Sequence, residues 1–167
     1  MGKVTTWSLE MSDPTALRRA PLPAGDLRLL RVARANPAYN RFLYSEVGRD
    51  WQWFDKLDWS DAQWRAWADR EALHTWVLYE GGAPAGYFEL EQQDAGNVEI
   101  AYFGLLPGYY GRGLGGWLLG ECIARAWDLG ARRVWVHTCS LDHPAALGNY
   151  RARGLRVFAE ATRSTCC

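Results

Sequence analysis

A run of glycines at a predicted strand-to-helix junction constrains this chain more than any other feature. Residues 105–116 read Leu-Leu-Pro-Gly-Tyr-Tyr-Gly-Arg-Gly-Leu-Gly-Gly. They follow an apolar stretch, Val98–Leu106, that predicts a buried strand. Residues 113–129 then carry apolar side chains at helical spacing, which predicts an amphipathic helix. Glycine reaches backbone conformations that other residues avoid, so the pattern predicts a strand, a tight turn and a helix in succession.

A turn of this kind is suited to hold an anion. Glycines let several backbone N–H groups point to one place, and the start of a helix adds about half a positive charge. Arg112, inside the turn, adds a full charge. The pattern therefore predicts a site for a pyrophosphate group, and a plain glycine turn without a ligand is the alternative.

The remainder of the chain alternates between strand-like and helix-like segments. Tight turns between the strands of residues 74–106 predict an antiparallel meander, and the helix that follows predicts a parallel partner for its last strand. The predicted strands are residues 4–11, 27–33, 74–79, 86–92, 98–106, 133–139 and 155–162. The predicted helices are residues 37–47, 60–72, 113–129 and 144–153.

Length and composition indicate one mixed α/β domain. The chain has 167 residues, of which 49% are hydrophobic and 23% charged, and this suits a single packed core. We expect one domain over residues 1–167, with an N-terminal strand and irregular connection (1–26) before the core (27–162). The formal net charge is zero, which argues against a general nucleic-acid binder.

The sequence also lacks the signals of several other protein classes. No apolar run has the length of a membrane span, and the start does not read as a signal peptide, so we expect a cytoplasmic protein. No CxxC pair is present and the three histidines are scattered, so no metal site is expected.

The glycine turn resembles a motif of the GNAT superfamily of acetyl-CoA-dependent N-acetyltransferases. That motif reads Gln or Arg, two residues, Gly, one residue, then Gly or Ala. Here the segment Tyr110–Gly115 keeps both glycines, Gly113 and Gly115, with the usual proline at Pro107, and has Tyr110 at the first position. The resemblance extends over residues 27–162 in the order of the predicted elements.

A second family motif lies further along the chain. His143, Ala146, Tyr150, Gly154 and Leu155 stand where the family has Asn, Ala, Tyr, Gly and Phe. The resemblance implies a GNAT-like α/β (α+β) fold: a mixed, mostly antiparallel sheet of six to seven strands, splayed at the cofactor cleft and flanked by about four helices.

The resemblance also implies that acetyl-CoA binds between the strands that end near Leu106 and Cys139. A backbone N–H near Leu105 would hydrogen-bond the thioester carbonyl. The cofactor-binding residues implied in this way are Leu105, Leu106, Tyr110, Gly111, Arg112, Gly113, Leu114, Gly115, Gly116, His143, Ala146 and Tyr150.

Two catalytic roles follow from the same resemblance. Tyr150 matches the general acid that protonates the leaving thiolate. Glu99 lies eleven residues before Tyr110, where one branch of the family has the glutamate that accepts the proton of the amine. Glu89, Glu91 and His137 are alternative bases, and a core role is the alternative for Tyr150.

A tryptophan-rich segment precedes the meander and is the expected acceptor side. Five of the ten tryptophans fall between residues 51 and 67. Trp51 and Trp53, beside carboxylates, are candidates to hold a cationic amine by cation–π contacts. Trp64 and Trp67, at helical spacing, are expected in the core. We expect a small-molecule primary amine as acceptor, and a monomer or homodimer.

Two other functions compete with this interpretation. Gly111, Gly113 and Gly116 also spell G-x-G-x-x-G, a dinucleotide-binding pattern. However, no acidic residue ends the next predicted strand, and only one βαβ unit is predicted. The other candidate is a module of the same fold that binds acyl-CoA without catalysis.

Overall fold

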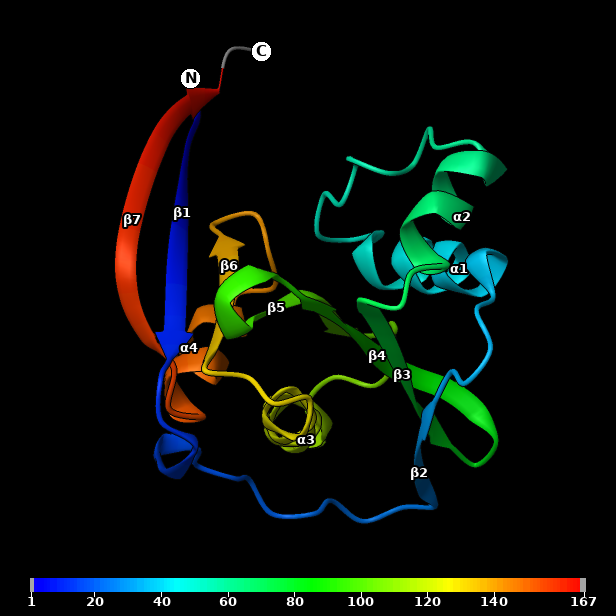
Figure 1. Ribbon diagram of the computed structural model, residues 1–167, viewed down its shortest axis with the longest axis horizontal. Helices are drawn as coiled ribbons and strands as arrows, with labels where there is room; N and C mark the ends of the chain where they lie inside the picture. Colours follow the sequence, from blue (N-terminus) through cyan, green and yellow to red (C-terminus); the bar gives the residue numbers. More distant parts are fainter. Residues whose placement is uncertain (1, 166–167) are drawn as a thin grey trace.

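A single seven-stranded sheet organises the molecule. The computed structural model describes residues 2–165, and its sheet has the order β2-β3-β4-β5-β6-β1-β7 (Figure 1). The strands are β1 (Gly2–Met11), β2 (Leu27–Arg31), β3 (Leu73–Glu80), β4 (Ala83–Gln92), β5 (Asn97–Leu105), β6 (Arg133–Cys139) and β7 (Arg156–Thr165). The α-helices of this part of the chain are α1 (Pro37–Gly48), α2 (Asp61–Ala68), α3 (Leu114–Asp128) and α4 (Ala146–Ala152).

The expected change of strand direction occurs between β5 and β6. These two strands are parallel, and every other neighbouring pair in the sheet is antiparallel. The parallel pairing covers three residue pairs, the last of which joins Glu99 to Trp135. Beyond that pair the two strands continue without pairing to each other, so the sheet is split toward the carboxyl ends of β5 and β6. The predicted mixed, splayed sheet is thus confirmed.

Helices cover the two faces of the sheet and bury its apolar side chains. α3 packs below the sheet, and α1 with α2 lies on the opposite face over β4 and β5 (Figure 1). The larger core cluster joins α3 to both halves of the sheet and includes Leu118, Cys122 and Ile123. Val47 of α1 packs against β5 where Gly104 leaves room for it.

Most predicted element boundaries agree with the structure, and two helices are shorter than predicted. The helix expected over residues 60–72 ends at Ala68. The carbonyl of Ala72 instead accepts a hydrogen bond from the backbone N–H of Gln92. The backbone at residue 72 is therefore already bonded to β4 and cannot continue the helix. The helix expected from residue 144 begins at Ala146, because residues 143–145 form a turn in which Ala146 N–H donates to the carbonyl of His143.

The N-terminal strand takes an internal position that its sequence does not reveal. β1 lies between β6 and β7 and is antiparallel to both. The first and last strands therefore pair within one chain and bring Gly2 next to Thr165 (Figure 1). Each helix in residues 2–165 falls short of the length and apolar character needed to cross a membrane.

Candidate active site

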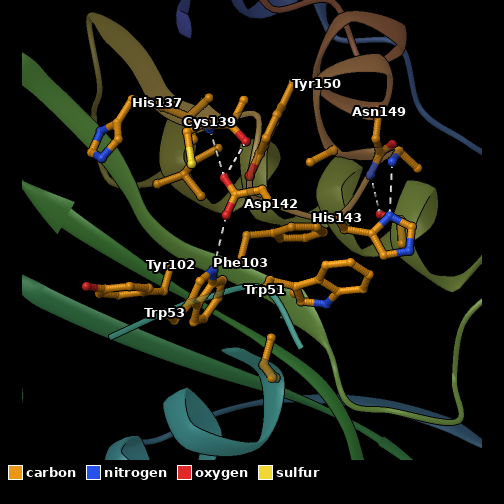
Figure 2. A pocket seen from close by; sticks show the side chains of 18 of the residues that line it. Trp51, Trp53, Tyr102, Phe103, His137, Cys139, Asp142, His143, Asn149 and Tyr150 are labelled. Atoms are coloured by element: carbon orange, nitrogen blue, oxygen red, sulfur yellow. Dashed lines mark hydrogen bonds between the residues drawn. The ribbon is translucent and has the colours of Figure 1, made fainter. Parts of the chain in front are cut away.

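A large cavity occupies the split between β5 and β6. Its volume is about 920 Å³, and its walls come from β5, β6, the start of α3, α4 and the α1–α2 loop. Figure 2 shows side chains from these elements pointing into the same space. Because β5 and β6 have stopped pairing here, the cavity reaches into the middle of the sheet, where side chains from distant parts of the sequence meet.

The glycine turn forms one end of this cavity. Gly111 and Gly113 have φ angles of +75° and +77°, a conformation that L side chains rarely adopt. Gly113 is the N-cap of α3, and no side chain caps the first N–H groups of that helix. Uncapped N–H groups at a helix start carry partial positive charge, so this end of the cavity suits a phosphate group.

Tyr150 points into the cavity from α4 (Figure 2). Its ring lies against that of Phe103 on β5, with centroids 6.3 Å apart, and 6% of the residue is exposed. Burial raises the pKa of the Tyr150 hydroxyl well above its usual value of 10.0. The hydroxyl is therefore protonated near neutral pH and can supply a proton inside the cavity.

Glu99 and His137 face each other at the point where the strands separate. Glu99 Oε1 lies 3.4 Å from His137 Nδ1, and both residues line the cavity. The hydrogen bond to Glu99 raises the pKa of His137 above its usual value of 6.5, although partial burial opposes this. The pair is a carboxylate–imidazole unit that can accept a proton from a group in the cavity.

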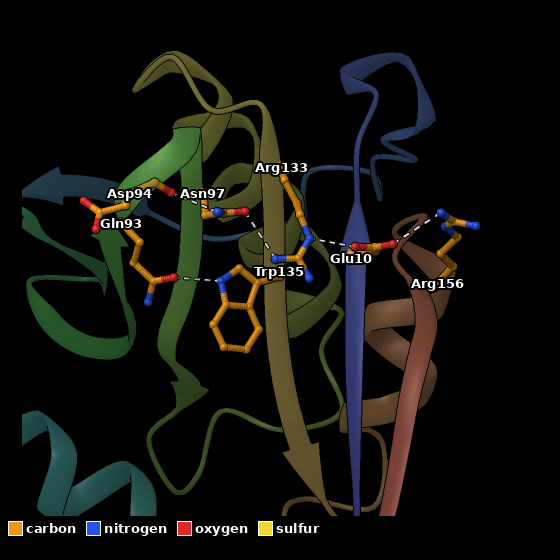
Figure 3. Close-up of polar contacts among 7 residues, drawn as sticks. All are labelled: Glu10, Gln93, Asp94, Asn97, Arg133, Trp135 and Arg156. Carbon is orange, nitrogen blue, oxygen red and sulfur yellow. Dashed lines mark hydrogen bonds and ion pairs between the residues drawn. The ribbon is translucent and has the colours of Figure 1, made fainter.

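An amide side chain in the β4–β5 turn fixes the position of Glu99. Gln93 Nε2 donates to Glu99 Oε2 over 2.7 Å, and Gln93 Oε1 accepts from Trp135 Nε1 over 3.0 Å. Figure 3 shows the side chain of Gln93, in the turn before β5, bonded to that of Trp135 on β6. Glu99 is thus held from two sides, by Gln93 at Oε2 and by His137 at Oε1.

Ion pairs hold the other strands beside this junction. Arg133 of β6 donates to Glu10 of β1 over 2.6 Å and to Asn97 of β5 over 3.2 Å (Figure 3). Glu10 also accepts from Arg156 of β7 over 3.3 Å. This network joins β5, β6, β1 and β7 at the closed end of the split and leaves its other end open.

Three aromatic rings meet above the glycine turn. Trp51 of the α1–α2 loop lies 4.7 Å from the ring of His143 and 6.2 Å from that of Tyr110, and the last two rings are 5.1 Å apart. The Tyr110 hydroxyl accepts from Trp51 Nε1 and donates to the carbonyl of Leu105. Tyr110 and His143, two of the residues that depart from the family motifs, are therefore in contact with each other.

Comparison with known proteins identifies the family. The model of the acetyltransferase (GNAT) family matches residues 40–155, more than two thirds of the chain. The chain belongs to the GNAT family.

Individual GNAT relatives agree with this assignment. An uncharacterised N-acetyltransferase of Mycobacterium tuberculosis is 35% identical over 81 residues, which cover 46% of this chain and 52% of the relative. This chain thus matches about half the length of that relative. A GCN5-related N-acetyltransferase structure from Kribbella flavida has a TM-score of 0.68 at 19% identity, covering 95% of this chain and 56% of the other.

A third similar protein is named for its acceptor. The structure of an aminoglycoside acetyltransferase from an uncultured soil metagenomic sample has a TM-score of 0.51 at 15% identity. It covers 66% of this chain and 78% of the other. At this identity the likeness is one of fold.

The GNAT fold brings most of the predicted site residues to one cavity. Those that line it are Trp51, Trp53, Glu99, Leu105, Tyr110, Gly111, Gly113, Gly115, Gly116, His143, Ala146 and Tyr150. Three others lie outside its lining. Arg112 is held by Glu80 through two hydrogen bonds of 2.6 and 2.8 Å. Leu114 is fully buried in the core. The N–H of Leu106 donates to the carbonyl of Ala85.

The alternative bases on β4 lie away from the lining of the cavity. Glu89 is 1% exposed and accepts hydrogen bonds from Asn40 and Trp67, and burial raises its pKa. Burial also favours a raised pKa at Glu91, but hydrogen bonds from Gln93 and Arg70 outweigh it and lower the pKa. Within the described residues, Glu99 and His137 are the members of the predicted set of bases that line the cavity.

Sequence reasoning missed two polar residues of this GNAT site. Asp142 accepts from Thr138, from the backbone N–H of Cys139 and from Trp53 Nε1, and thereby joins β6 to the α1–α2 loop. Asn149 donates to the carbonyl of Gly115 over 3.1 Å and so fixes α4 to the glycine turn. Asp142 directly precedes the second motif and Asn149 lies inside it, between Ala146 and Tyr150, and at neither place did spacing alone carry a signal.

The tryptophan segment divides between core and cavity. Trp64 is buried, as predicted. The prediction for Trp67 was wrong: its ring lines the cavity and its Nε1 donates to Glu89 over 2.9 Å. Helical spacing places both residues on one face of α2, but Trp67 is half-buried and contacts Lys56 and Glu89 in place of the core.

Proposed function

We propose that this chain transfers an acetyl group from acetyl-CoA to a primary amine of a small molecule, with both bound at once. The observation that carries the proposal is that the uncapped glycine turn, Tyr150 and the Glu99–His137 pair all open into one cavity. These are an anion-binding end, a proton donor and a proton acceptor, which are the parts that acyl transfer to an amine requires.

The chain's own residues fit acetyl-CoA at the glycine end. The pyrophosphate would be held by backbone N–H groups of the turn that contains Gly111, Gly113, Gly115 and Gly116. Tyr110 and His143 would lie beside the part of the cofactor that connects the pyrophosphate to the thioester. When bound, acetyl-CoA supplies the thioester that the amine attacks. Arg112 is engaged by Glu80, so the backbone would carry the larger share of phosphate binding.

Proton movements follow from the positions of the titratable groups. An amine that is charged at neutral pH must lose a proton before it attacks, and the Glu99–His137 pair is placed to accept it. Tyr150, which its usual pKa of 10.0 already keeps protonated at neutral pH, is placed to give a proton to the departing sulfur. A new C–N bond thus replaces the C–S bond, and the products are an amide and CoA.

Charge in the cavity supports a cationic acceptor. The carboxylates of Asp55, Glu99 and Asp142 line the cavity with one arginine, Arg163. The aromatic rings of Trp53 and Tyr102 stand on the same side as Asp55 and can pack on the apolar part of an amine. Acetylation of an aminoglycoside, implied by the name of one protein of this fold, is chemistry of the same class.

A ligand titration tests the cofactor, and an amine screen then tests the reaction. The purified chain is titrated with CoA, acetyl-CoA and NAD while melting temperature is followed. A ligand at a hundredfold excess over its dissociation constant adds about 2.7 kcal/mol of stability. We expect shifts with CoA and acetyl-CoA and none with NAD. If neither CoA compound shifts the melting temperature, the transferase proposal fails. Binding without turnover of any amine would support the non-catalytic module.

A further inference from the structure

Lys56 is a buried primary amine that the proposed mechanism does not use. It lies in the α1–α2 loop and is 8% exposed. Its Nζ is 3.8 Å from the ring centroid of Trp59, 4.3 Å from that of Trp67 and 5.5 Å from that of Tyr102. These three rings form an aromatic cage around the Nζ atom.

The aromatic cage shares its walls with the proposed acceptor side of the cavity. Trp67 and Tyr102 both line the cavity, as does Asp55, the residue before Lys56. Two of the three rings around the Lys56 amine therefore belong to residues that also line the cavity. A lysine side chain is a flexible four-carbon stem, so a transfer to Lys56 requires a change of rotamer that carries Nζ from the cage into the cavity.

The surroundings of Lys56 also favour a reactive amine. Burial lowers the pKa of Lys56 from its usual value, although Glu89 and Asp55 oppose this shift. A larger fraction of Lys56 is therefore in the neutral form than for an exposed lysine at the same pH, and the neutral amine is the form that attacks a thioester.

The chain offers a built-in comparison for the chemistry of Lys56. It contains two lysines, Lys3 and Lys56, among 19 basic residues. Lys3 is exposed on β1, where it pairs with Ser164 of β7, and it is not part of the cavity lining. Lys56 does not line the cavity either, but two of the rings around it do. A reagent in bulk solvent should therefore reach Lys3 first, and a group bound in the cavity should reach Lys56 first.

We propose that Lys56 is a self-acetylation site, at which Nζ takes the acetyl group from acetyl-CoA bound in the chain's own cavity. The inference rests on the proposed function. Nζ forms a bond to the thioester carbonyl carbon and the C–S bond breaks. The proton that the amine loses passes to the Glu99–His137 pair, the sulfur is protonated from Tyr150, and the products are N-acetyl-Lys56 and CoA.

Self-acetylation would change the acceptor side of the cavity. An acetamide carries no charge, so the aromatic cage would lose its cation while Asp55 and Glu99 keep their carboxylates. The cavity wall becomes more negative, and a cationic acceptor is then attracted more strongly. The modification would thus adjust the preference of the same site for its amine.

Mass spectrometry of the whole chain tests the inference. The purified protein is incubated with isotopically labelled acetyl-CoA, and acetylation of the Lys56 and Lys3 peptides is followed over time. We expect Lys56 to be labelled faster than Lys3 by about tenfold or more, at a rate independent of protein concentration. Tyr150→Phe should slow labelling at Lys56 and leave that at Lys3 unchanged. Unlabelled acetyl groups on Lys56 of the isolated protein, reduced in Tyr150→Phe, would also support the inference.

A second measurement needs no acetyl-CoA. With acetic anhydride alone, we expect Lys3 to react before Lys56, because Lys56 is buried. If Lys56 reacts with the anhydride as readily as Lys3, its acetylation would need no cavity and the inference is wrong. It is also wrong if labelled acetyl-CoA modifies Lys56 no faster than Lys3, or equally in Tyr150→Phe. Acetylation of an added amine in the same sample without labelling of Lys56 would leave the proposed function intact, whereas failure of both would remove it too.

Discussion

The indole Nε1 of Trp51 donates to the hydroxyl of Tyr110 over 3.2 Å, and this bond joins the α1–α2 loop to the glycine turn. The same hydroxyl donates to the carbonyl of Leu105 at the end of β5. Tyr110 therefore connects three segments at the place where the family usually has Gln or Arg. His143, another departure from the family motifs, completes the group of rings.

Replacement of Tyr110 by phenylalanine should weaken this connection. The change removes two hydrogen bonds, each worth about 0.5–1.5 kcal/mol, and should lower the melting temperature by roughly 2–4 °C per kcal/mol lost. Differential scanning calorimetry measures the shift. Tyr109→Phe is the matched control, because no hydrogen bond of the Tyr109 hydroxyl is found among residues 2–165. Equal shifts for the two variants would contradict the bridging role of Tyr110.

Removal of the Tyr150 hydroxyl should slow the reaction while leaving cofactor binding in place. Loss of a general acid lowers rates by about 10²–10⁴-fold, so Tyr150→Phe should show this fall in kcat with an unchanged shift of melting temperature by CoA. Tyr87→Phe is the control: Tyr87 is buried on β4 with an unpaired hydroxyl, so its loss should be neutral or stabilising. A kcat for Tyr150→Phe equal to that of the wild type would show that the proton comes from elsewhere.

The Glu99–His137 pair should make stability depend on pH in a defined direction. Glu99 raises the pKa of His137 above 6.5, so the stabilisation by the charged pair is fully present below pH 6.5 and is lost as the pH rises through the raised pKa. Urea denaturation at about pH 5.5 and pH 8.5 should therefore separate wild type from His137→Asn more at the lower pH.

A double-mutant cycle isolates the interaction between these two side chains. In the Glu99→Gln background, His137→Asn should lose most of its pH-dependent effect, because the partner carboxylate is gone. A pH-dependent difference that persists in that background would assign the effect to another group facing His137.

Gly104 should tolerate no larger side chain. A Cβ at this position of β5 would overlap Val47 of α1, so Gly104→Val should push α1 away from the sheet and cost about 1–3 kcal/mol. Chemical denaturation measures the loss. Gly148→Ala in α4 is the control, since no atom lies within 4 Å of its Cβ position and alanine favours a helix by about 0.5–1 kcal/mol. Similar stability of Gly104→Val and wild type would mean that α1 is not fixed against β5.

Local sequence signals predicted the parts of the site that one segment builds alone. The glycine turn follows from four glycines in six residues, and the start of α1 from Asn36 before Pro37. The capping box of Ser60 and Gln63 is present as predicted. In each case the residues that decide the conformation are neighbours in the chain, so a short stretch of sequence is enough to predict the local structure.

Contacts between distant segments were beyond local signals. The place of β1 between β6 and β7 depends on pairing across more than 120 residues. The contact of Trp51 with Tyr110 and His143 requires three loops to converge, and the aromatic cage of Lys56 requires α2 to face β5. No spacing within a segment encodes such meetings, because they result from how the whole sheet folds.

The short pairing of β5 with β6 has a mechanical consequence. Three residue pairs connect one half of the sheet, β2 to β5, to the other half, β6, β1 and β7. The second half is tied far more extensively within itself, along the full lengths of β1 and β7. We therefore expect the molecule to bend most easily at this seam, the short pairing of β5 with β6. α3, which packs on both halves of the sheet, lies beneath it. A compound that fills the split would stiffen both halves together, so amide exchange should slow on both sides of the seam, far from any atom that the compound touches.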